Sequence, residues 1–218
     1  EMCIRDRMYR DIPYILIGHS MGSFMARKYA CIYGDELDGV IFLGTGNQPK
    51  SVVNAGLKLA HMAKLVHGDR YRSRLINKLM FGTYNKRIKD NRTDSDWLTK
   101  DTAIVDEYTA DPKCSYMFTA NGYIGFLNVI RFDINEKNIA RTPAALPVLF
   151  ASGEEDPVGD YGKAVKKVFK LYTKYVDNVE LRLYEDDRHE LHSETNRQEV
   201  FEDLLEWIES DVLAHDID

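Results

Sequence analysis

Residues 14–22 read Tyr-Ile-Leu-Ile-Gly-His-Ser-Met-Gly. The first four are a short continuous apolar run, which predicts a strand buried on both faces of a parallel sheet. The last five form a G-x-S-x-G pattern, and we expect a helix to follow it over residues 20–33. The pattern alone is common by chance, but its position between a buried strand and a helix is specific.

This context predicts a tight strand-to-helix turn that holds Ser20 in a strained backbone conformation, with its hydroxyl above the edge of the sheet. Side chains at Gly18 and Gly22 would collide with the neighbouring strand and helix. The start of a helix favours developing negative charge, so the Met21 N–H is an expected oxyanion donor. We therefore predict that Ser20 is a nucleophile; the alternative is a serine that only caps a helix.

Further strands and helices are predicted around this unit. Gly34 is expected to stop the first helix in a left-handed conformation, before a buried strand over residues 40–43. A third strand is expected over residues 148–151, then a helix from about residue 160. Residues 179–184 alternate apolar with polar side chains, as in a half-exposed strand near a sheet edge. The predicted fold is α/β, with a mostly parallel sheet and helices on both faces.

The last predicted helix begins at Thr195, which forms a capping-box pattern with Gln198. Its apolar positions are expected to face the core, and they are Val200, Phe201, Leu204, Leu205 and Ile208.

About a hundred residues without convincing strands separate the two halves of this pattern. We assign residues 1–46 and 147–218 to the α/β core, and residues 47–146 to a helical cap inserted into it. The helix expected over residues 52–66 is apolar on nearly every face, which is typical of a helix buried between two layers. Residues 84–111 are dense in charge and are expected to form the solvated exterior of the insertion.

A serine hydroxyl needs a base, and the base needs an acid that orients it. The candidate acid is Asp156, just past the end of the third strand, where the functional loops of open α/β sheets lie. Pro157 biases it away from a helical conformation. Glu154 and Glu155 are rival acids, and a solvated acidic turn is the alternative interpretation.

The candidate base is His189, between the last strand and the last helix. His192 competes with it, and a histidine on a surface loop is the alternative interpretation. The order along the chain is Ser20, Asp156, His189, as in the elbow-type serine hydrolases.

The elbow, the Gly-Glu-Glu-Asp-Pro-Val-Gly segment at residues 153–159 and the Arg-His-Glu segment at residues 188–190 resemble the monoacylglycerol lipase and lysophospholipase branch of the α/β hydrolases, a serine aminopeptidase-like group. The resemblance covers most of the chain. It implies an α/β-hydrolase fold with a helical cap, in which Ser20 is the nucleophile, His189 the base and Asp156 the orienting acid.

The sequence departs from that family at its beginning. The family starts with several strands and a His-Gly loop that supplies a second oxyanion N–H, whereas only 19 residues precede Ser20 here. Residues 1–7 show no structural pattern. We therefore expect that the N-terminal strands are missing, that the natural protein is longer, and that this exact chain is weak or inert.

Composition excludes several classes of function. The net charge of −6, with both signs interspersed, offers no basic stripe for nucleic acid and no attraction to anionic membranes. No apolar run is long enough to span a bilayer. Three cysteines without paired spacing suggest neither a disulfide framework nor a zinc site, which fits a reducing cytosol. No metal-ligand spacing, phosphate loop or dinucleotide fingerprint is present, so no cofactor is expected.

The expected substrate is a small, lipid-like ester. The helix at residues 52–66, together with Phe118, Tyr123, Phe126 and Leu127, predicts an apolar lid that buries a hydrophobic acyl group. The alternative is that these residues form only the insertion's own core. An aminopeptidase or amidase with the same triad, and a non-catalytic binding protein on this scaffold, are the rival functions. The oligomeric state is left open.

Overall fold

The computed structural model describes residues 12–114 and 116–214. Its centre is a parallel sheet with the strand order β1-β2-β3-β4. The strands are β1 (Ile15–His19), β2 (Gly39–Leu43), β3 (Val148–Gly153) and β4 (Val179–Tyr184). The predicted parallel α/β sheet is thus confirmed, together with the predicted order of strands and helices.

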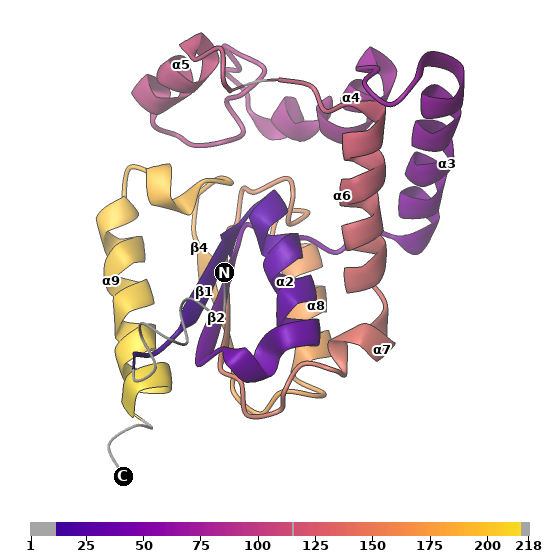
Figure 1. The fold of residues 1–218 in the computed structure, drawn as a ribbon. Coiled ribbons are helices and arrows are strands. Elements are labelled where there is room, and N and C mark those ends of the chain that lie inside the picture. Colours follow the sequence, from indigo (N-terminus) through magenta and orange to yellow (C-terminus); the bar gives the residue numbers. More distant parts are fainter. Residues whose placement is uncertain (1–11, 115, 215–218) are drawn as a thin grey trace.

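Helices cover both faces of this sheet, with α2 and α8 on one side and α9 on the other (Figure 1). Alternate residues of β2 explain the two layers, because Val40 and Phe42 join one apolar cluster while Ile41 and Leu43 join the other. The core helices and short turns are α2 (Met21–Tyr33), η1 (Gly34–Glu36), α8 (Lys163–Tyr172), η3 (Leu191–Ser193), α9 (Arg197–Trp207) and η4 (Ile208–Leu213).

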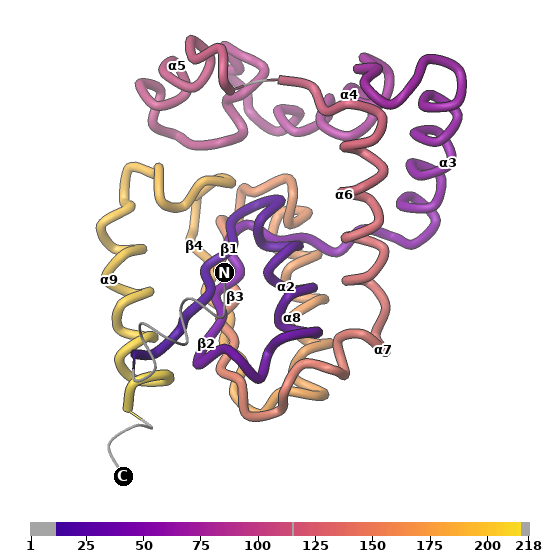
Figure 2. Tube along the Cα trace, viewed as in Figure 1, coloured from indigo at the N-terminus to yellow at the C-terminus, as the bar shows by residue number. Residues whose placement is uncertain are grey.

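The residues between β2 and β3 that the structure describes form helices and turns, and they lie over the end of the sheet where α2 begins (Figures 1 and 2). Here α3 and α6 run side by side. The elements are α3 (Lys50–His67), α4 (Arg74–Phe81), η2 (Tyr84–Arg87), α5 (Thr102–Ala110), α6 (Ala120–Asp133) and α7 (Glu136–Ile139). None of the described helices is both long and apolar enough to cross a bilayer.

Strand β1 is not buried on both faces, which corrects the prediction for residues 14–17. It is an edge strand among the described residues, since it pairs only with β2. Ile17 is accordingly 50% exposed. The prediction for residues 1–7 lies outside the described residues.

Helix α3 is buried on one side only, so the expectation of a helix between two layers was wrong. Val53, Leu57 and Ala60 pack into the insertion's apolar cluster, which includes residues of α6. In contrast, Met62 is 63% exposed and Leu65 is 86% exposed. Composition alone could not reveal this, because both faces of the helix carry apolar side chains.

Helix α9 differs from its prediction in start and in orientation. It begins at Arg197 after Asn196, without a side-chain cap, so the expected capping box of Thr195 and Gln198 does not form. Val200, Leu204 and Trp207 are the buried residues of the helix. Phe201 is 46% exposed and Leu205 is 54% exposed, because the buried face is centred on the Trp207 indole.

Two local conformations also differ from expectation. Gly34 is right-handed, with φ −62°, because the chain continues into the turn η1 instead of stopping. Helix α8 begins at Lys163, later than the expected residue 160, because Asp160 and Tyr161 both adopt positive φ.

Candidate active site

The turn between β1 and α2 has the strained geometry expected of a nucleophile elbow. Ser20 has φ 52° and ψ −121°, a conformation that L-residues rarely adopt. Its N–H donates to the Leu43 carbonyl oxygen at 3.0 Å, which anchors the turn to the neighbouring strand. A Cβ atom at Gly18 would lie 2.5 Å from the Gly22 carbonyl oxygen, so glycine is required at residue 18.

The predicted collision at Gly22 is not found. A Cβ atom there would have no described heavy atom within 4 Å apart from its own helix backbone and immediate neighbours. Met21 is the first residue of α2, and the N–H groups of a helix's first turn have no partner inside the helix. The Met21 N–H is therefore not used by the helix itself.

The structure brings Asp156 and His189 together, 33 residues apart in the chain. The His189 Nδ1–H donates to Asp156 Oδ1 at 3.0 Å. The side chains are 1% and 0% exposed, respectively. Because Nδ1 is the donor, Nε2 of a neutral imidazole carries the free lone pair, and this is the tautomer that a general base needs.

Asp156 is held by its own loop as well as by the imidazole. Its Oδ1 also accepts from the Val158 N–H at 2.8 Å, and its Oδ2 accepts from Ser152 Oγ at 3.3 Å. The rival carboxylates Glu154 and Glu155 are exposed on the same loop. Asp156 thus differs from Glu154 and Glu155 in being buried and in being bonded to His189.

The backbone of the elbow is connected to the base through the end of β2. Gly44 follows Leu43 and has φ 57°, and a Cβ atom there would lie 3.0 Å from Nδ1 of His189. The Nε2 atom of His189 is buried and has no hydrogen-bond partner among the described residues, so it is not bonded to the Ser20 hydroxyl in this structure.

His19, the residue before Ser20, also contacts His189. Its Nε2–H donates to the backbone oxygen of His189 at 3.2 Å, and the two ring centroids are 4.8 Å apart. His192, the rival base, is exposed and packs edge-on against His19 at 4.8 Å. Burial, together with His189 and His192, lowers the pKa of His19 to about 3, despite the nearby carboxylate of Asp156.

We expect a His19→Gln variant to resist acid better than the wild-type chain. Between about pH 3 and pH 6.5 the unfolded chain binds more protons at His19 than the folded chain. The contribution of His19 to the free energy of unfolding is therefore complete above pH 6.5 and is lost as the pH falls toward 3. Glutamine can still donate to the His189 oxygen but does not titrate. The free energy of unfolding of the variant minus that of wild type should be larger at pH 5 than at pH 8, by at most about 2 kcal/mol. Urea unfolding at both pH values measures this, and equal differences at the two would contradict it.

The insertion contributes a segment to the site that sequence reasoning missed. The indole of Trp97 lies against the His189 imidazole, with ring centroids 4.9 Å apart. The backbone carbonyl oxygen of Trp97 accepts from the backbone N–H of His189 at 3.4 Å. The sequence predicts that residues 84–111 form the solvated exterior of the insertion, but part of this range is buried. Asp96, Leu98, Thr99 and Val105 are buried within this range.

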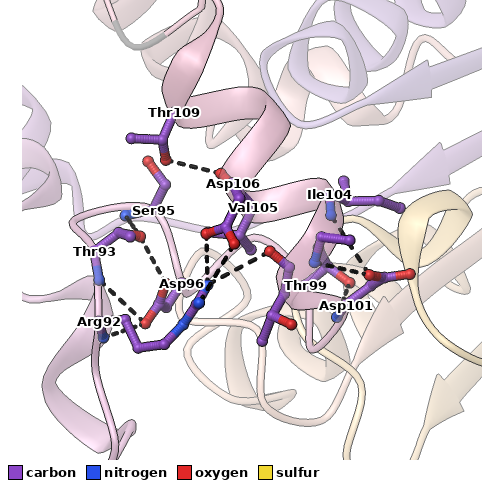
Figure 3. A network of polar contacts seen from close by, with 12 residues as sticks. Arg92, Thr93, Ser95, Asp96, Thr99, Asp101, Ile104, Val105, Asp106 and Thr109 are labelled. Carbon is purple, nitrogen blue, oxygen red and sulfur yellow. Dashed lines mark hydrogen bonds and ion pairs between the residues drawn. The ribbon is translucent and has the colours of Figure 1, made fainter.

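A polar network fixes the turn that precedes Trp97 (Figure 3). The carboxylate of Asp96 accepts from the N–H of Arg92, the N–H of Thr93 and the hydroxyl of Thr93. Arg92 in turn pairs with Asp106 of α5 at 2.7 Å. Arg92 and Asp106 are themselves exposed, whereas Asp96 is buried in the same segment. No local pattern in the sequence signals this.

The aromatic and aliphatic residues that were predicted to line a lid mostly pack against each other. Tyr123 is fully buried and its hydroxyl donates to Asn77, while Leu127 is 3% exposed in the same cluster. This cluster reaches the site at two points. Phe126 packs edge-on against Phe24 of α2, and Trp97 joins the cluster at its margin.

Comparison with known proteins finds a matching family model and a protein of similar sequence. The family model described as serine aminopeptidase, S33, matches residues 3–196. The monoacylglycerol lipase of Mycolicibacterium smegmatis is 25% identical over 202 residues, which is 91% of this chain and 63% of that lipase. The chain therefore spans less than two thirds of the length of this relative.

Solved structures with a similar fold include esterases and lipases. A thermostable carboxyl esterase from Bacillus coagulans superimposes with a TM-score of 0.88 at 27% identity, covering 96% of this chain and 68% of the esterase. A lipase in an open form gives a TM-score of 0.84 at 25% identity, covering 97% of this chain and 70% of the lipase. The fold described above is thus that of the α/β hydrolases.

Proposed function

The chain belongs to the serine aminopeptidase S33 family of α/β hydrolases, and from this membership we propose that it is a serine hydrolase that cleaves carboxylic esters with a hydrophobic acyl group, such as monoacylglycerols or lysophospholipids. The proposed catalytic residues are Ser20, Asp156 and His189. The observation that carries the proposal is the buried hydrogen bond from His189 to Asp156, together with a serine in the strained elbow conformation.

In the proposed reaction, Ser20 Oγ attacks the ester carbonyl carbon while its proton passes to Nε2 of His189. The Met21 N–H stabilises the negative oxygen of the tetrahedral intermediate. The ester bond then breaks, and the alcohol leaves with the proton that His189 returns. Water attacks the resulting acyl-enzyme by the same route in reverse, releasing the acid and restoring the serine.

The Asp156 carboxylate holds the imidazole in the tautomer that accepts this proton, and its charge stabilises the imidazolium that forms. The hydrogen bonds from Val158 and Ser152 keep that carboxylate in place. Catalytic groups in structures without substrate are often separated by more than a hydrogen-bond distance, and we expect the Ser20 hydroxyl and His189 to close up around a bound ester.

A hydrophobic acyl group is proposed because apolar side chains reach the site from the insertion. The Trp97 ring lies against the proposed base at a tilt of 42°, and Phe24 lies four residues after the proposed nucleophile, in contact with Phe126. Each methylene group buried between such surfaces contributes about 0.8 kcal/mol. The names of the lipase and esterase relatives support the same substrate class.

We therefore expect turnover to rise with acyl length. In a series of p-nitrophenyl esters from acetate to dodecanoate, kcat/KM of the natural full-length protein should peak at octanoate or longer. Trp97→Ala should lower the value for the long esters more than for acetate, because it removes an apolar wall. Leu65→Ala, which changes an exposed apolar residue of the insertion, is the matched control. A maximum at acetate would contradict the proposed acyl preference.

An aminopeptidase is the second candidate, because the family description carries that name. The same three residues can cleave an amide, so the scissile bond has to be tested with substrates. Alanine and proline p-nitroanilides should be cleaved much more slowly than the octanoyl ester. Faster cleavage of an anilide than of any ester would favour the aminopeptidase. Absence of turnover on both classes would favour a binding protein.

We also propose the cytosol as the location of the protein. Cys31 and Cys114 are free thiols in the part of the chain that the structure describes, and a reducing compartment keeps thiols in this state. Fractionation of the source cells would test this.

A further inference from the structure

The loop that carries His189 is joined along its length to residues 96–100 of the insertion. The Glu190 N–H donates to the Leu98 carbonyl oxygen at 2.7 Å. The Arg188 guanidinium donates to the carbonyl oxygens of Asp96 at 2.7 Å and Thr99 at 3.0 Å. These bonds connect segments about 90 residues apart, so the position of the proposed base depends on the insertion as well as on the sheet.

One buried carboxylate lies at the centre of this junction. Glu194 is fully buried. Its Oε1 accepts from the Arg188 N–H at 2.7 Å, and its Oε2 accepts from the Lys100 N–H at 3.0 Å. The first N–H belongs to the residue before the base and the second to the insertion. Because a backbone N–H can only donate, both positions require an acceptor, and an ionised carboxylate supplies two.

Asp187 ties the same loop both to the insertion and to the loop that carries Asp156. The Lys100 ammonium pairs with Asp187 at 2.8 Å, and the Asp187 side chain is fully buried. The Asp187 carbonyl oxygen accepts from the Glu155 N–H at 2.9 Å, next to Asp156. The same Asp187 carbonyl oxygen also lies close to Gly153, where a Cβ atom would be 2.1 Å from it. The base loop is therefore held between the acid loop and the insertion.

We propose that Glu194 is a positioning residue for the reaction: its carboxylate clamps the backbone beside His189 to the backbone of Lys100, so that the base and residues 96–100 of the insertion move as one unit. The inference rests on the proposed function, because it assigns Glu194 a role through His189. Glu194 has no contact with the proposed nucleophile. It acts by fixing where the imidazole lies relative to the Ser20 hydroxyl.

The test compares Glu194→Gln with Glu199→Gln in the natural full-length protein. Glutamine has the shape of glutamate but replaces one acceptor oxygen by an NH₂ group, which would face a backbone N–H. Glu199 is an exposed glutamate in the first turn of α9 whose carboxylate accepts from the Asn196 side chain at 3.3 Å, so the control makes the same chemical change away from the junction with the insertion. Each variant is compared with wild type well below its melting temperature, with circular dichroism to show that it is folded.

Two readouts are needed. The first is activity: kcat on p-nitrophenyl octanoate, and the rate of labelling by a fluorophosphonate probe. Both should fall roughly ten- to hundredfold in Glu194→Gln with KM within about twofold, the size expected for a lost charge-assisted hydrogen bond, and should stay unchanged in Glu199→Gln. The second is amide hydrogen exchange, which should speed up at Arg188 and Lys100 together by at least about tenfold in Glu194→Gln only.

The outcomes separate the two proposals. If the wild-type protein neither turns over esters nor labels, the proposed function fails, whatever hydrogen exchange shows. If the wild-type protein is active and folded Glu194→Gln keeps its kcat, the positioning role is overturned. The role is also overturned if activity falls while exchange at Arg188 and Lys100 is unchanged, or if the loss is matched by the unfolded fraction, since a purely structural residue would give that result.

Discussion

In the natural full-length protein, a Ser20→Ala variant is expected to lose about a millionfold in kcat on p-nitrophenyl octanoate, the scale seen when the nucleophile of a serine hydrolase is removed. The variant should also lose all labelling by a fluorophosphonate probe, and mass spectrometry of the labelled wild-type protein should locate the adduct on Ser20. Alanine has no hydroxyl to attack the carbonyl carbon. The fold should be unaffected, because the Ser20 side chain caps no helix and the residue is held through its backbone, whose N–H donates to Leu43 and whose carbonyl oxygen accepts from Ser23.

Ser20→Gly provides a control that separates chemistry from stability. A non-glycine residue at φ 52° and ψ −121° costs about 1–3 kcal/mol of backbone strain, which glycine avoids. Glycine should therefore be as inactive as alanine and yet more stable by about 1 kcal/mol in urea unfolding, after its greater freedom in the unfolded chain is allowed for. Full labelling in either variant would show that Ser20 is not the nucleophile.

The second large effect is expected for Asp156→Asn, which should lower kcat by about ten thousandfold. Asparagine can preserve much of the geometry, since its oxygen can accept from His189 and Val158 while its NH₂ donates to Ser152 Oγ. The variant should therefore fold. It lacks the negative charge that stabilises the imidazolium, and its amide can favour the tautomer that leaves no lone pair on Nε2 of the base.

Glu155→Gln is the matched control for Asp156→Asn. It makes the analogous change from acid to amide one residue earlier in the same loop, on an exposed side chain. Its kcat should stay within about twofold of wild type, as expected for a surface substitution away from the reacting groups. A large loss in Glu155→Gln, or a small one in Asp156→Asn, would mean that the acid has been assigned to the wrong carboxylate.

The limits of the sequence are clearest in the insertion. Its charged residues Arg92 and Asp106 are exposed, as their charge suggested, whereas Trp97 in the same segment contacts His189. In α3, apolar residues on every face suggested burial on both sides, whereas one side packs and the other is exposed. The composition of a segment shows which side chains are charged or apolar, but it does not show which of them pack against the rest of the fold.

The sequence by itself determined the α/β sheet, the order of its elements, the elbow at Ser20 and a short set of candidates for the acid and the base. These features depend on residues within a few positions of each other: an apolar run, a glycine where a Cβ would clash, a proline after a loop residue. Only the tertiary structure shows that Asp156 and His189 are paired and buried while Glu154, Glu155 and His192 are exposed, because this pairing joins residues 33 positions apart. The same holds for the contact of Glu194 with Lys100, across 94 positions. A hydrogen bond between distant segments leaves no period in the sequence, so only the folded chain reveals it.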